Sequence, residues 1–122
     1  MVWMVVAAIY GATAVIAGAF GAHGLRDTLA PEQLSAWNTA TLYHLLHSVA
    51  LLALGLYGAT TGRSVALPAV LFAAGVLLFS GSIYGLVLTS QRWLGPVTPI
   101  GGLLMIAAWL SLIALARPQT GS

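Results

Sequence analysis

The chain has 122 residues, of which 60% are apolar and only 5% carry a charged side chain. An ordinary soluble domain carries charge on about a quarter of its residues, so this composition indicates an integral membrane protein. The formal net charge is +2 and the arginines are scattered rather than clustered, which excludes a nucleic-acid-binding surface. The absence of cysteine also excludes disulfides, thiolate metal ligands and thiol nucleophiles.

The first predicted membrane helix covers residues 2–22, a stretch without any charged side chain. About 20 apolar residues are enough to cross the hydrocarbon core of a bilayer. The basic amino-terminal region of a signal peptide is absent, so we expect this segment to remain in the mature fold. Small residues recur every three or four positions, which predicts a smooth stripe for close helix packing. They are Ala7, Gly11, Ala14, Gly18 and Gly21.

The second predicted helix covers residues 31–58 and follows a polar segment that contains Arg26 and Asp27. Pro31 suits the first turn of a helix, because the amide hydrogen that proline lacks is not needed there. At 1.5 Å per residue, this helix is longer than the hydrocarbon core is thick. The excess length predicts either a tilted helix or a first turn that lies in the membrane interface.

Two further spanning helices are predicted at residues 65–89 and 97–116. Four helices with short connections predict an all-α membrane protein, with one up-down-up-down four-helix bundle as a single domain of residues 1–122. Both termini then lie on the same side of the membrane. The arginines divide equally between the two sides, so only the α-amino group and the acids Asp27 and Glu32 favour cytoplasmic termini.

Two histidines, His44 and His47, lie one helical turn apart inside the apolar run of the second predicted helix. An ionisable side chain is costly to hold in lipid, so it is a candidate functional residue. The topology places further polar residues in the same half of the membrane, opposite the termini. This convergence predicts a pocket for ligand binding or proton handling. Its candidate residues are His23, Tyr43, His44, His47, Ser80, Ser82, Tyr84 and Thr98.

Four ordered blocks of the chain, at residues 18–25, 43–47, 78–84 and 92–102, resemble the signature of a known family. This is the YgdD-like family, a bacterial inner-membrane family of unknown function with an animal relative called transmembrane protein 256. The resemblance implies a four-helix inner-membrane protein, and it transfers no activity because none is settled for the family. It places these residues on motif positions: His23, Tyr43, His47, Ser80, Ser82, Tyr84, Arg92 and Thr98. His44 departs from the pattern, which weakens any mechanism that requires both His44 and His47.

The histidines leave several roles open. His47 is a packing residue that bonds a neighbouring helix, a proton carrier, or a ligand of a metal or haem. Zinc and similar metals take three or four ligands, and only His23 is available as a third, so we commit to no metal site and leave the cofactor unassigned. Catalysis by a nucleophile has little support, because Asp27 and Glu32 are the only carboxylates. An enzyme is therefore the less favoured class.

Two other features have both a structural and a functional interpretation. Arg92 and Trp93 are candidates for binding a lipid head group, although such a pair is also typical of any helix end at the interface. Gly101 and Gly102 follow Pro99 and either cap the fourth helix or leave backbone groups free for a ligand. Capping is the favoured interpretation, because proline is common in a first turn.

Together these features predict a multi-pass protein of the bacterial inner membrane that binds a small ligand or serves as an accessory protein. The alternatives are a histidine-dependent conduit for protons or small solutes, and a metal- or haem-binding membrane protein. The expected partner is the lipid bilayer; a homo-oligomer and a subunit of a larger complex are both left open. The pocket hypothesis requires that His23, His47 and Ser82 do not face lipid or separate helices.

Overall fold

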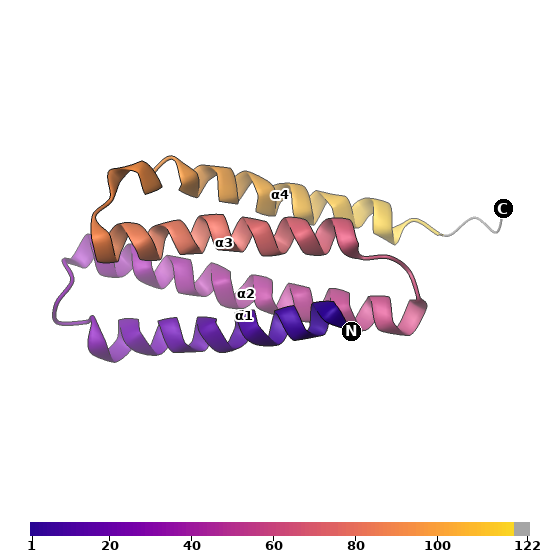
Figure 1. Ribbon diagram of the computed structural model, residues 1–122, viewed down its shortest axis with the longest axis horizontal. Helices are drawn as coiled ribbons and strands as arrows, with labels where there is room; N and C mark the ends of the chain where they lie inside the picture. Colours follow the sequence, from indigo (N-terminus) through magenta and orange to yellow (C-terminus); the bar gives the residue numbers. More distant parts are fainter. Residues whose placement is uncertain (119–122) are drawn as a thin grey trace.

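A computed structural model describes residues 1–118, and every long element in that range is a helix (Figure 1). A π-helical turn, η1 (Phe20–Gly24), continues the first helix, and a 3-10 turn, η2 (Arg92–Leu94), precedes the last. The up-down-up-down order of helices confirms the predicted all-α fold. The long helices are α1 (Val2–Ala19), α2 (Pro31–Thr61), α3 (Ala66–Thr89) and α4 (Val97–Ala116).

Each of the four helical segments is long and apolar enough to cross a membrane. The 31 residues of α2 make it the longest, and at 1.5 Å per residue it measures about 47 Å. It continues past residue 58 to Thr61, where Gly62 ends it with a left-handed φ of 73°. Because the hydrocarbon core is only about 30 Å thick, α2 extends beyond the core or tilts within it.

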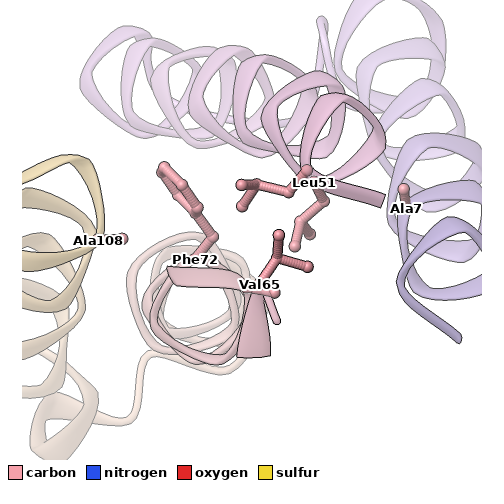
Figure 2. Packing of buried hydrophobic residues seen from close by; sticks show 7 residues of the cluster. Ala7, Leu51, Val65, Phe72 and Ala108 are labelled. Carbon is pink, nitrogen blue, oxygen red and sulfur yellow. The ribbon is translucent and has the colours of Figure 1, made fainter. Parts of the chain in front are cut away.

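The helices lie side by side in the order of the sequence, as a row (Figure 1). Each packs most extensively against a sequence neighbour, α1 against α2 and α3 against α4. Phe72 and Leu51 lie between Ala108 of α4 and Ala7 of α1 (Figure 2). All four helices therefore contribute to one apolar cluster. It consists of Ala7, Leu51, Leu54, Val65, Ala69, Phe72 and Ala108.

Helices α3 and α4 approach closely at Gly75 and Gly101. A Cβ atom on Gly101 would lie 2.2 Å from the backbone nitrogen of Phe79 and 2.8 Å from the carbonyl oxygen of Gly75. A Cβ atom on Gly75 would lie 2.7 Å from Cγ of Met105. Gly101 thus lies inside α4 against α3, and the capping role expected for it is wrong. Glycine is present here because the two backbones leave no room for a side chain.

The small-residue stripe of α1 packs only in part. Ala7 and Ala14 are buried, and Gly21 lies against the ring of Trp37, where a Cβ atom would be 2.7 Å from Cδ1. At Gly18, in contrast, a Cβ atom would meet nothing within 4 Å. The stripe therefore has close packing at some positions and open space at another.

Arg63, in the connection between α2 and α3, holds the carboxyl end of α4. Its Nη1 atom donates to the carbonyl oxygen of Leu115 at 2.6 Å, to that of Arg117 at 3.3 Å, and to the hydroxyl of Tyr57 at 3.0 Å. The last carbonyl groups of a helix lack partners within the helix and carry partial negative charge. Arg63 therefore satisfies these groups and fixes the end of α4.

Replacing Arg63 with alanine is expected to loosen the last turn of α4. A cation at a helix carboxyl end contributes about 1 kcal/mol, so amide hydrogen exchange at residues 113–116 should accelerate about fivefold. Hydrogen exchange with mass spectrometry on the protein in detergent measures this rate. Arg63→Lys keeps the charge and should show a smaller acceleration. Unchanged exchange in Arg63→Ala would mean that these contacts do not hold the helix end.

Candidate functional site

His47 is buried and faces α3 and α4. Its Nδ1 atom lies 2.7 Å from the carbonyl oxygen of Tyr43. A carbonyl oxygen only accepts, so Nδ1 carries the hydrogen. The indole Nε1 of Trp109 donates to Nε2 of His47 at 3.1 Å. The ring is therefore the neutral Nδ1–H tautomer, and it joins α2 to α4 with both nitrogen atoms occupied.

His44 is also buried, and it joins α2 to α1 and α3. Its Nε2 atom lies 3.1 Å from the hydroxyl oxygen of Thr13, and its Nδ1 atom lies 3.0 Å from the hydroxyl oxygen of Tyr84. The ring of Tyr10 packs edge-on against the imidazole, with ring centroids 6.0 Å apart. The imidazole thus connects one hydroxyl from α1 with another from α3.

Three further hydroxyl groups form hydrogen bonds between helices. Ser80 donates to the carbonyl oxygen of Ala40 at 2.8 Å and joins α3 to α2. The hydroxyl oxygens of Ser82 and Thr98 lie 2.5 Å apart and join α3 to α4. In a bilayer, such bonds satisfy polar groups that lipid cannot. Ser80, Ser82 and Thr98 therefore already have a structural role.

The structure does not bring the predicted polar residues into one pocket. Successive residues of a helix are rotated by 100°, so His44 and His47 point about 60° apart and face different neighbouring helices. His23 is exposed in η1, away from both. The requirement that His23, His47 and Ser82 share a pocket is not met. In residues 1–118, no group of three or more His, Asp or Glu residues is placed to hold a metal ion.

The candidate residues for a lipid head group, Arg92 and Trp93, are exposed in η2. The η2 turn lies between α3 and α4, at the end of the bundle opposite the amino terminus (Figure 1). This position is compatible with the membrane interface, where arginine and tryptophan are both common.

A cleft of about 550 Å³ lies between α1 and α3. Its floor on α2 includes Trp37 and His44, and its walls are largely apolar side chains such as Ile16 and Leu77. Of the predicted residues, His44, Ser80 and Tyr84 line this cleft. Its polar lining residues are Tyr10, Thr13, His44, Ser80 and Tyr84.

A second cleft, of about 540 Å³, lies between α2 and α4. Tyr43 and His47 line it together with Trp109, and Phe79 of α3 contributes to it. Of the predicted residues, this cleft contains two, Tyr43 and His47, whereas the first cleft contains three. We therefore take the cleft between α1 and α3 as the candidate site.

Sequence reasoning missed several residues that complete these networks. Tyr10 donates to the carbonyl oxygen of Ala73 at 2.8 Å and joins α1 to α3. The indole of Trp37 donates to the carbonyl oxygen of Ala17 at 2.8 Å. These residues, together with Thr13 and Trp109, could have been identified from the sequence. Each has a polar atom within a spanning segment, where such atoms need partners.

Spanning helices, a buried apolar cluster and side-chain hydrogen bonds between helices define an integral membrane protein with four transmembrane helices. The chain belongs to the family described as "Protein of unknown function (DUF423)", which matches residues 17–102. This finding confirms the resemblance to an uncharacterised membrane family that the four sequence blocks indicated.

The relatives are named only as membrane proteins. A "UPF0382 membrane protein" of Staphylococcus epidermidis is 45% identical over 112 residues, which cover 92% of each chain. A relative from Staphylococcus saprophyticus is 44% identical and covers 92% of this chain and 93% of its own. One from Staphylococcus haemolyticus is 48% identical over 96 residues, or 79% of each chain. No solved structure matches the chain.

Proposed function

We propose that this protein binds a small, largely apolar molecule in the cleft between α1 and α3, where hydroxyl oxygens such as that of Tyr84 are its polar contacts. The observation that carries the proposal is the cleft itself. Its volume of about 550 Å³ is typical of ligand pockets, which range from about 300 to 1,000 Å³. Such pockets combine apolar walls with a few placed polar groups, and this cleft has both.

The ligand would enter from the bilayer rather than from water. Ile9 and Ile16 of α1 and Leu77 and Leu88 of α3 line the cleft, and each is more than half exposed. Within a spanning segment, these side chains meet lipid. A molecule that is already dissolved in the membrane therefore reaches the cleft without crossing a polar barrier.

The alternative classes have less support from the geometry. A proton conduit needs a path across the membrane, yet the hydrogen bonds of His44 lead from Tyr84 to Thr13, whose hydroxyl bonds the carbonyl oxygens of Ile9 and Tyr10. Within residues 1–118, this line therefore ends on the backbone. A metal or haem ligand needs a free ring nitrogen, and those of His47 are both engaged.

We also propose the bacterial plasma membrane as the location, with both termini in the cytoplasm. The bacterial relatives named as membrane proteins support the location. The orientation rests on the amino-terminal charge and on two acids at the opposite end of the bundle, Asp27 in the connection and Glu32 in the first turn of α2. The test is a reporter that is active only in the periplasm, fused to either terminus. Reporter activity would overturn the orientation.

Filling the cleft is expected to abolish binding. Gly81 lines the cleft, and a Cβ atom there would meet only Cδ1 of Leu77, at 3.9 Å, so Gly81→Leu should fold and occupy the space. A photoactivatable long-chain alcohol, added to the protein in nanodiscs, should label peptides of α1 and α3 in the wild type. Labelling of these peptides should fall at least about tenfold in Gly81→Leu, because the substituted side chain takes the ligand's volume.

Gly18→Leu is the matched control, because a Cβ atom at Gly18 meets nothing within 4 Å and this residue does not line the cleft. It should leave the labelling unchanged. Labelling spread evenly over lipid-exposed residues of every helix, and equal in both variants, would contradict a binding site in this cleft.

A further inference from the structure

The hydroxyl groups that line the cleft direct their hydrogens away from it. Tyr10 donates to the carbonyl oxygen of Ala73 and Ser80 donates to that of Ala40, both at 2.8 Å. Thr13 donates to the backbone of its own helix, where the carbonyl oxygens of Ile9 and Tyr10 lie 2.9 and 3.0 Å away. Each hydroxyl has a single hydrogen, so none of these three has one left for a ligand.

The hydrogen of Tyr84 is assigned by the same reasoning. We assign the Thr13 hydrogen to the backbone carbonyl oxygens, which lie nearer than His44. The Thr13 oxygen then accepts from His44, so Nε2 of His44 carries the ring hydrogen. Nδ1 of the neutral ring is then an acceptor, and the Tyr84 hydroxyl at 3.0 Å must donate to it. The last hydroxyl of the cleft therefore also has no free hydrogen. Its oxygen keeps its lone pairs.

We propose that the occupant of the cleft is an uncharged, membrane-soluble molecule that carries a hydroxyl group, which donates a hydrogen bond to the lining oxygens. The inference rests on the proposed function and names the ligand class. The polar lining has lone pairs to offer and no hydrogens, so it complements a donor. A ketone, an ester or a quinone presents only acceptors and finds no partner there.

Charge argues against ionised occupants. Placing a carboxylate or an ammonium group in an apolar site without a charged partner is strongly unfavourable. The 15 residues that line the cleft include no arginine, aspartate or glutamate, and their one histidine has both ring nitrogens in hydrogen bonds. The matching ligand is therefore neutral, and a long-chain alcohol is the simplest probe of this class.

Competition against the photoactivatable alcohol tests the inference on the wild-type protein in nanodiscs. The competitors are cetyl alcohol, its methyl ether, methyl palmitate and palmitate, which share similar chains and differ in the polar group. One neutral hydrogen bond contributes about 0.5–1.5 kcal/mol, so cetyl alcohol should compete about three- to tenfold better than the ether. Methyl palmitate and palmitate should match the ether or compete less well.

Nitrogen-15 NMR of the imidazoles provides an independent readout. His44 is expected to carry its hydrogen on Nε2 and His47 on Nδ1. The two imidazoles should therefore show two distinct patterns of nitrogen-15 chemical shifts in one spectrum. If His44 carries its hydrogen on Nδ1, the Tyr84 hydrogen is free and the inference is overturned. Equal competition by the alcohol and the ether overturns the inference but leaves a ligand in the cleft. Absence of labelling in the cleft removes both proposals.

Discussion

Replacing Gly101 with alanine is expected to force α4 away from α3. The added methyl group would lie 2.2 Å from the backbone nitrogen and 2.7 Å from the Cα atom of Phe79. Backbone atoms cannot move aside as a flexible side chain would, so the helices must shift. Overpacking of this kind costs at least about 2 kcal/mol. Unfolding of the protein in mixed micelles by added sodium dodecyl sulfate, followed by circular dichroism, measures the free energy of unfolding.

Gly102→Ala is the matched control for Gly101→Ala. A Cβ atom on Gly102 would lie 3.8 Å from Cδ1 of Phe79, an ordinary contact. Alanine is the better helix former by about 0.5–1 kcal/mol, so this variant should be as stable as the wild type or slightly more stable. Equal losses in the two variants would show that α3 and α4 do not cross at Gly101.

Replacing His47 with alanine is expected to destabilise the bundle by about 2–4 kcal/mol. The substitution leaves a cavity beside Phe72 and deprives the indole nitrogen of Trp109 of its acceptor. It also removes a side-chain hydrogen bond between α2 and α4. The same detergent titration measures the loss. Trp109→Phe removes the hydrogen-bond donor and part of the ring that packs on Phe72, and it should lose at least about 0.6–1.7 kcal/mol.

His23→Ala is the control for the His47 substitution, because the side chain of His23 is exposed in η1. Its free energy of unfolding should stay within about 0.5 kcal/mol of the wild type. If His47→Ala and His23→Ala lose equal stability, His47 does not stabilise the contact between α2 and α4.

The spanning helices could be predicted because their signals are local. Uninterrupted apolar stretches, Pro31 at a helix start and Arg63 in a turn each act within a few residues. The role of Gly101 is different, since it depends on where the backbone of Phe79 lies across a helix interface. Its position after Pro99 indicated a cap, and only the packing of two helices shows why glycine is required.

The candidate site was less accessible to sequence reasoning. Depth along a helix could be estimated from residue number, which is why the polar residues were placed in one half of the membrane. Direction around the helix axis depends on which neighbours pack on which face. This direction differs between His44 and His47, which therefore face different helices. It also places Tyr10 and Thr13 of α1 at the site.

The row arrangement of the helices has a consequence for biosynthesis. Because α1 packs most extensively on α2, and α3 on α4, the chain consists of two helical hairpins in the order of translation. Each hairpin would enter the bilayer with its main partner already attached, including the Gly101 crossing in the second. The contacts between the hairpins then form laterally within the membrane. They include the bond from Ser80 to Ala40, the bond from Tyr10 to Ala73 and the bond from Trp109 to His47.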